Sequence, residues 1–281
     1  MPFLPPVTTR DLAARFSTDE TCRAALTELR WSDGFFCPAC GGAVPGQTVS
    51  RVLMECRACG RQVSATADTL LHRSHVGLPE WFIATWGMAS TRDSNSITLA
   101  RQIGVRQRIA WSMLSRLRTA MARSLAAPLT GIVEADEAFF GHKEHQSTVE
   151  VLVETRTDRR VRMAAVPGQT GSILVPFIVA RVKPGSTVRT DGWKGYLDLE
   201  HAGFEHERIV HTPGWAERGE RSTPYADEAI SAAKRWLLAT YNKPPTAANL
   251  DAYLAEFCFR REYREPGAAC EALLRGLVTP R

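Results

Sequence analysis

The sequence of 281 residues predicts a multidomain α+β protein with a cysteine-rich N-terminal module, a helical middle region and a C-terminal α/β domain on a mixed central sheet. Three observations predict this fold class. Two Cys-x-x-Cys pairs lie near the N-terminus, an arginine-rich stretch of helical periodicity follows, and strand-like alternation begins after a proline break near residue 128. Strands followed by alternating helix and strand favour a mixed sheet. The expected domains are therefore 1–75, 76–127 and 128–281.

The composition excludes several classes of protein. Apolar residues make up 44% of the chain and charged residues 23%, which is ordinary for a globular protein and not for a disordered one. The sequence has no apolar run of the ~18 residues that a transmembrane helix needs, and its proline-broken start does not resemble a signal peptide. The odd number of cysteines, seven, fits a reducing compartment better than a secreted disulfide framework. We expect a cytoplasmic protein with no membrane partner.

The two cysteine pairs predict a zinc ribbon. Each two-residue gap allows a tight turn to direct two thiolates toward one point, and the fifteen residues between the pairs can form a hairpin that brings the turns together. Four thiolates fill the coordination shell of Zn²⁺, so the predicted site is structural and not catalytic. The predicted ligands are Cys37, Cys40, Cys56 and Cys59. The other three cysteines, Cys22, Cys258 and Cys270, are expected to be buried. A helix beginning near Ser17, with Glu20 at capping-box spacing, should precede the ribbon.

The positive charge of the chain is concentrated in one segment. Residues 92–124 contain seven arginines and one acid, Asp93, giving a net charge of +6 in a chain of net charge +5. After a helix at 78–91, the pattern predicts a short helix capped by Ser96, a turn at Gly104 and a helix from Arg106 to Ser124 with Ile109 on its buried face. This arrangement is typical of a helix-turn-helix that binds double-stranded DNA; a linker bundle with a solvated arginine face is the alternative. The candidate DNA contacts are Arg101, Arg106, Gln107, Arg108, Arg116 and Arg118, with the last two contacting phosphates.

Two aspartates lie at the ends of predicted strands in the C-terminal half. Strands are expected at 131–141, 149–155, 161–166 and 187–190, with a hairpin turn at 157–160 and helices at 172–182 and 225–241. The segment 172–182 also fits a strand. Asp136 and Asp191 can then meet at one edge of the sheet and bind a divalent metal ion. A third acid should come from the later helix, as Asp227 or Glu228, with Lys234 on the same helical face as Asp227. Taken singly, each aspartate is also consistent with a turn or a helix cap.

Together these motifs resemble those of bacterial insertion-sequence transposases, which join an N-terminal zinc ribbon to a ribonuclease H-like catalytic domain with an acidic (DDE-type) triad. The resemblance extends over nearly the whole chain. Its motifs are Leu29-Arg30-Trp31, Gly34-Phe35-Phe36-Cys37-Pro38-Ala39-Cys40, Ser64-Ala65-Thr66-Ala67-Asp68-Thr69-Leu70, Leu99-Ala100-Arg101-Gln102-Ile103-Gly104-Val105, Ala110-Trp111, Val133-Glu134-Ala135-Asp136-Glu137, Thr190-Asp191-Gly192-Trp193-Lys194-Gly195-Tyr196 and Lys234-Arg235-Trp236-Leu237.

The resemblance implies a function and assigns roles to the acids. It implies a DNA transposase that binds the ends of an insertion element, cleaves DNA and joins the 3′ ends to target DNA by two-metal phosphoryl transfer with Mg²⁺ or Mn²⁺. Its partners would be the terminal repeats, the target DNA and further copies of the chain. Asp136 and Asp191 occupy the positions of the first two metal ligands. The third falls on Asp227, with Glu228 as the competing position, and Lys234 would contact a DNA phosphate.

Two segments depart from the family pattern. Ala239–Lys243 stands where the family has Gly-Thr and a histidine pair, and Arg260–Glu265 stands where it has an Arg-Phe-Asn-Arg-Arg run. Both are expected to lie near the third acid. Two other functions therefore stay open, a catalytically inactive transposase-derived regulator that binds DNA and a metal nuclease without strand transfer.

Overall fold

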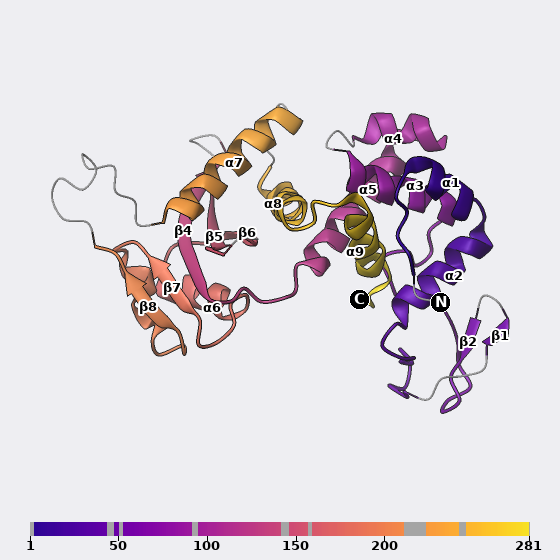
Figure 1. Ribbon diagram of the computed structural model, residues 1–281, viewed down its shortest axis with the longest axis horizontal. Helices are drawn as coiled ribbons and strands as arrows, with labels where there is room; N and C mark the ends of the chain where they lie inside the picture. The colour runs from indigo at the N-terminus through magenta and orange to yellow at the C-terminus, as the bar shows by residue number, and fades with distance from the viewer. Residues whose placement is uncertain are drawn as a thin grey trace. The chain divides into compact units, whose positions relative to one another are not determined.

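The chain forms two compact units, Met1–Ser124 together with Tyr263–Arg281, and Leu125–Glu262 (Figure 1). The computed structural model describes residues 3–43, 48–50, 53–91, 95–141, 146–156, 159–210, 223–241 and 246–280. Arg92, Asp93, residues 157–158 of the predicted hairpin turn and residues 242–243 lie outside these ranges. Within them, no helix combines the length and the hydropathy that a bilayer crossing requires.

The first unit is a helical bundle that carries the small cysteine-rich sheet. Its helices include α1 (Thr9–Arg15), α2 (Asp19–Arg30), α3 (Leu78–Ser90), α4 (Ser96–Ile103), α5 (Gln107–Ser124) and α9 (Pro266–Val278). Helix α9 lies beside α5 although the two are far apart in the sequence (Figure 1), and it also packs on α3 and α2. The contact is close, because a Cβ at Gly276 would lie 2.5 Å from the carbonyl oxygen of Ala120. The expected domain 128–281 includes this helix, whereas in the structure its buried leucines complete the core of the first unit.

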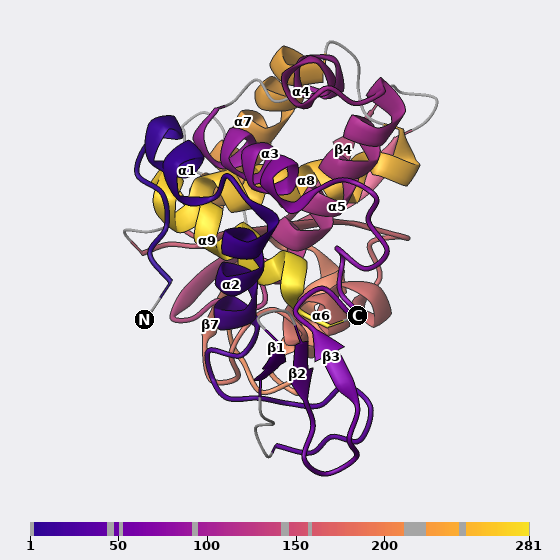
Figure 2. The same ribbon diagram turned by 90° about the vertical axis from the view of Figure 1, so that its right-hand side faces the viewer.

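Three short antiparallel strands form the ribbon, β1 (Thr48–Ser50), β2 (Leu53–Glu55) and β3 (Gln62–Ser64), and they lie side by side in Figure 2. Arg30 at the end of α2 holds the ribbon in place. Its guanidinium donates hydrogen bonds to the carbonyl oxygens of Ser64, Ala65 and Ala67 at 2.9, 3.1 and 2.7 Å. At the other end of α2 the N-cap is Thr18, one residue after the predicted Ser17, because the Thr18 hydroxyl accepts from the backbone of Thr21.

Helices α4 and α5 form the predicted helix-turn-helix. Gly104 ends α4 with φ of 70°, a left-handed conformation that glycine adopts without strain. The N-cap of α4 is Asn95 and not Ser96, since the Asn95 side chain accepts from the backbone of Ile97 and Thr98. Ile109 was predicted in the buried face of α5 but is 40% exposed, because it lies in the first turn at the margin of the face that Ala110 and Met113 bury.

The second unit is built on a five-stranded sheet in the order β6-β5-β4-β7-β8. Strand β4 is antiparallel to β5 and parallel to β7, β6 is antiparallel to β5, and β8 is parallel to β7. The strands are β4 (Ile132–Phe140), β5 (Ser147–Glu154), β6 (Val161–Val166), β7 (Thr187–Thr190) and β8 (Glu205–Arg208). This sheet confirms the predicted α/β domain with a mixed central sheet.

Helices cover both faces of the sheet because β4 and β5 are apolar on both sides. One face packs against α6 (Gly171–Val179) and the 3₁₀ helix η2 (Lys194–Leu199), so the helical interpretation of 172–182 is confirmed. The other face packs against α7 (Pro224–Tyr241) and α8 (Ala247–Glu262). Along β4, Val133 and Ala135 pack on the face covered by α6 and η2, whereas Ala138 and Phe140 pack on the face covered by α7 and α8. The side-chain alternation of β4 therefore directs Asp136 toward α7.

Candidate functional site

The four predicted cysteines converge in the ribbon. Their sulfur atoms all lie within 4.8 Å of one another, with the Sγ atoms of Cys37 and Cys59 3.8 Å apart and those of Cys40 and Cys56 3.6 Å apart. A tetrahedral zinc site with Zn–S bonds of ~2.3 Å requires S···S distances of about 3.8 Å. The two turns are alike, since Gly41 donates to the carbonyl of Cys37 and Gly60 donates to that of Cys56. The donor set and spacing fit a structural Zn²⁺.

The remaining cysteines are buried as expected. Cys22, Cys258 and Cys270 each have 0% exposure. Burial raises the pKa of each of these thiols to about 12. At neutral pH they are therefore uncharged and act as small apolar side chains.

Three aspartates share one electrostatic environment in the second unit. Glu134 of β4 pairs with Arg189 of β7, and continuing this parallel register by two residues brings Asp136 opposite Asp191. Asp227 lies in the first turn of α7. Burial, together with the negative charges of Asp191 and Asp227, raises the pKa of Asp136 to about 6 against hydrogen bonds from Thr223 and the backbone of Glu137. The charges of Asp191 and Asp227 therefore act on Asp136 in the folded protein.

This cluster has the donor chemistry of a divalent-metal site. Carboxylate oxygens are the ligands that Mg²⁺ and Mn²⁺ prefer. The mutual repulsion of the three carboxylates is the kind that a bound cation relieves. Their oxygens do not all come within 4.8 Å of one another, whereas among the described residues the four cysteine sulfurs do. The three aspartates therefore fit Mg²⁺ or Mn²⁺ by their charge and by the type of ligand atom that they offer.

Glu228 and Lys234 lie apart from the three aspartates. The carboxylate of Glu228 accepts from Arg261 of α8 at 3.2 and 2.9 Å, which directs it away from β4. The ammonium nitrogen of Lys234 lies 5.4 Å from the ring centre of Phe140, at the far end of β4. Seven helical residues separate Lys234 from Asp227, a distance of about 10 Å along the axis. Lys234 is exposed and lies outside the acidic cluster.

Sequence reasoning missed the residue that anchors α7. Glu134 is fully buried on β4 and accepts hydrogen bonds from the backbone N–H groups of Tyr225 and Ala226 at 2.7 and 3.0 Å. Arg189 lies 3.6 Å from its other oxygen. Two orphan donors at the start of α7 are thereby satisfied by the central strand. The available signal was strand alternation, which places Glu134 on the same face as Asp136.

A second acidic pair lies on the opposite face of β4. Glu137 pairs in register with Glu150 of β5, and the Tyr196 hydroxyl donates to the Glu150 carboxylate at 3.2 and 3.3 Å. Burial raises the pKa of Glu137 to about 7 and that of Glu150 well above its ordinary value. Burial therefore favours the uncharged form of Glu150 behind Asp136.

The predicted DNA contacts divide into exposed and internal residues. Arg118 is only 6% exposed, and Arg116 donates to the carbonyl oxygen of Leu70 at 3.0 Å. Phosphate contact by Arg118 is therefore contradicted, because its position falls between the buried Leu117 and Ala120 on the packed face of α5. The exposed candidates surround the α4–α5 turn: Arg101, Arg106, Gln107 and Arg108.

Both units match models of one transposase family. Residues 128–262 match the ISXO2-like transposase domain, and residues 17–62 match the transposase zinc-ribbon domain, both of the IS1595 type. The chain belongs to the IS1595-type transposases. This IS1595-type chain is also 26% identical over 284 residues to an uncharacterized protein in transposable element ISH50 of Halobacterium salinarum, covering 90% of this chain and 94% of that protein.

A second relative and two solved structures match a smaller part of this chain. An uncharacterized transposase-like protein of Haemophilus influenzae is 38% identical over 58 residues, 21% of this IS1595-type chain and 47% of that protein. A chain of the simian T-cell lymphotropic virus intasome has 17% identity and a TM-score of 0.34, covering 60% of this chain and 66% of that one. The HTLV-2 integrase catalytic core domain in complex with magnesium has 14% identity and a TM-score of 0.31, covering 48% and 85%.

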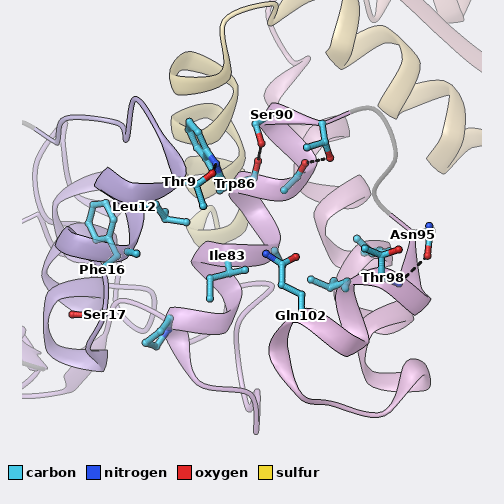
Figure 3. Close-up of a pocket in the computed structure, with 17 residues that line it drawn as sticks. Thr9, Leu12, Phe16, Ser17, Ile83, Trp86, Ser90, Asn95, Thr98 and Gln102 are labelled. Atoms are coloured by element: carbon cyan, nitrogen blue, oxygen red, sulfur yellow. Dashed lines mark hydrogen bonds between the residues drawn. The ribbon is translucent and has the colours of Figure 1, made fainter.

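An uncharged pocket lies elsewhere in the helical unit of this IS1595-type protein. It has a volume of about 500 Å³ between α1, α3 and α4, and Figure 3 shows Leu12, Phe16 and Ile83 on its wall. Trp86 closes one side, where its indole nitrogen donates to the Thr9 hydroxyl at 3.0 Å. Among the described residues that line it, none is charged. The pocket therefore lacks the cations that contact with DNA requires.

Replacing Cys37 with Ser in this transposase should remove about one Zn²⁺ per chain and unfold the ribbon, since metal binding and folding are coupled in such sites. Elemental analysis would report the metal, and hydrogen exchange at 53–64 would report the unfolding. Cys22→Ala should keep the zinc. A wild-type protein purified without zinc, or a Cys37→Ser variant with a full complement, would contradict the prediction.

Proposed function

We propose that this transposase binds the ends of its insertion element, cleaves DNA there and joins the freed 3′ ends to target DNA. The observation that carries the proposal is the cluster of Asp136, Asp191 and Asp227, in which two carboxylates raise the pKa of the third. It lies in the segment that matches the transposase domain. Hydrolysis and strand transfer are both in-line displacements at phosphorus, so one site can perform both.

The three aspartates would hold Mg²⁺ or Mn²⁺, which when bound supplies charge neutralisation and an activated oxygen nucleophile. The protein positions the carboxylates. Thr223 donates to the Asp136 carboxylate at 3.0 Å, and the backbone of Trp193 donates to that of Asp191 at 2.8 Å. The backbone of Glu137 donates to the other oxygen of Asp136 at 2.8 Å, so these hydrogen bonds fix the orientation of the carboxylates that would face the metal. The assignment of Asp227 in place of Glu228 is supported by the Arg261 contact described above.

Each unit would contact DNA with its own side chains. Lys234 is exposed beside Phe140 and could contact a phosphate there. Arg106, Gln107 and Arg108 lie at the start of α5, the part of a recognition helix that contacts base edges. Several copies of the chain would assemble to hold two element ends and a target.

A strand-transfer assay tests the proposal. The inverted repeats that flank the gene supply the labelled element ends, and a supercoiled plasmid supplies the target. We expect joined product with Mg²⁺ or Mn²⁺ and none with EDTA. Specific binding of the repeats without cleavage would instead identify the inactive regulator, and cleavage without joined strands would identify a nuclease.

A further inference from the structure

A positively charged groove lies in the first unit between the loop 73–77 and the N-terminal half of α5. Its volume is about 800 Å³. Glu80 is the acid among its described lining residues, and His75 also faces it. The arginines that line it are Arg73, Arg106, Arg108 and Arg116. With histidine neutral, these residues give the groove a net charge of +3, which favours a polyanion.

An exposed tryptophan lines the same groove. Trp111 is 51% exposed and the neighbouring Ile109 is 40% exposed. Trp81, 2% exposed, lies deeper, with the Arg116 guanidinium 6.0 Å from its ring centre. Large apolar side chains displayed together in a concave, cationic setting indicate a ligand that brings both a flat ring and negative charge.

The loop opposite α5 is held in place by its own hydrogen bonds. The Ser74 hydroxyl accepts from the Trp81 indole at 2.8 Å and from the backbone of Val76 at 3.2 Å. Arg73 has φ of 53°, a left-handed conformation that costs energy for a residue with a side chain. Its guanidinium is exposed and forms no ion pair with any described residue. The loop backbone is therefore held in place, and no described acid neutralises the Arg73 guanidinium.

We propose that this groove binds an unpaired segment of DNA, with a base stacked on Trp111 and an adjoining phosphate on Arg73. Bases inside a duplex already stack on one another, so a tryptophan in a concave surface can stack only on a base that has left the helix. The inference rests on the proposed function, because cleavage at an element end creates strands that can unpair. It adds the loop 73–77 and Trp111 to the helix-turn-helix surface.

Fluorescence anisotropy can test the groove with full-length, zinc-loaded protein in EDTA-free buffer without Mg²⁺, so that no catalysis is involved. The probes are a labelled duplex and the same duplex with a short oligo-dT extension. Wild type should bind the extended probe more tightly. Trp111→Ala should weaken binding of the extended probe about tenfold and leave duplex affinity unchanged, whereas Trp111→Phe should retain the preference. Ile97→Ala, an exposed apolar position on α4 away from the groove, is the matched control.

Salt dependence separates phosphate contact from a structural effect. Arg73→Ala should lower the slope of log affinity against log salt by about 0.7 for the extended probe, since one single-strand phosphate contact is lost. Arg10→Ala, an exposed arginine of α1, should not change it. Equal wild-type affinity for both probes, or an equal loss for both with Trp111→Ala, would overturn the proposal. An intact preference for the extended probe together with absent strand transfer would remove the proposed function and leave the groove assignment standing.

Discussion

Asp136→Asn should abolish both cleavage and strand transfer while leaving the chain folded. Asn keeps the shape of the side chain and one acceptor for Thr223, but it removes the charge that would bind the metal. Because metal ions contribute several kcal/mol of transition-state stabilisation, the rate of joining should fall about a thousandfold or more. DNA binding by the first unit should be unchanged. A single-turnover joining assay beside an anisotropy measurement would check both parts.

The same substitution should stabilise the metal-free protein. The pKa of Asp136 is raised to about 6 by burial and by Asp191 and Asp227, so the folded state binds its proton more tightly than the unfolded state does. Such a carboxyl lowers the free energy of unfolding of the protein as the pH rises from its pKa in the unfolded state through its pKa in the folded state. In EDTA at pH 8, Asp136→Asn should therefore raise the free energy of unfolding by roughly 1–3 kcal/mol, and the gain should vanish below about pH 4. Stabilisation on removal of one charge is expected of a site whose like-charged carboxylates repel one another in the folded protein.

The third ligand can be assigned by a matched pair of variants. Asp227→Asn should reduce joining as strongly as Asp136→Asn. Glu228→Gln should change it less than about twofold, since it removes only an exposed ion pair with Arg261. If Glu228→Gln is the variant that abolishes joining, Glu228 and not Asp227 is the ligand. If neither variant matters, the proposed triad is wrong.

Local spacing accounts for what the sequence predicted well. Two Cys-x-x-Cys pairs determine their own geometry within a few residues, and the cysteine cluster was predicted in full. Asp191 follows β7 as predicted, whereas Asp136 lies within β4 and not at its end. The parallel register of β4 with β7 runs toward both aspartates. Helix α7 was predicted to within one residue because its apolar face has a clear period.

Long-range packing accounts for what the sequence did not predict. Charge alone marked Arg118 as a phosphate contact, but which arginines face solvent depends on the packing around α5, and α9 comes from the other end of the chain. Glu150 and Tyr196 meet only when β5 and η2 come together, and nothing local signals that contact. Local sequence assigns no role to Glu134, because its partners lie 55 and 91 residues away. Buried polar networks depend on tertiary structure and leave little trace in local patterns.

Glu134→Ala should be the most destabilising single change in the second unit apart from large core truncations. It leaves the backbone N–H groups of Tyr225 and Ala226 without their buried acceptor and removes the ion pair with Arg189, which keeps Glu207. Removing one partner of a buried charged pair costs about 3–5 kcal/mol of unfolding free energy. Urea denaturation followed by circular dichroism would measure the loss. The matched control is Glu207→Ala, which removes the exposed second partner of Arg189 and should cost less than about 1 kcal/mol.

Glu134→Gln separates positioning from folding. The amide oxygen can still accept from the start of α7, so this variant should fold with a loss of about 1–2 kcal/mol, while the ion pair with Arg189 is gone. Because α7 carries Asp227 and β7 leads into Asp191, a looser anchor should lower the rate of joining about tenfold or more without changing DNA affinity. Raising the Mn²⁺ concentration should recover part of that rate if metal binding is what weakened. A Glu134→Ala variant no less stable than Glu207→Ala would show that the start of α7 is held by other contacts, and the role of Glu134 would then be lost.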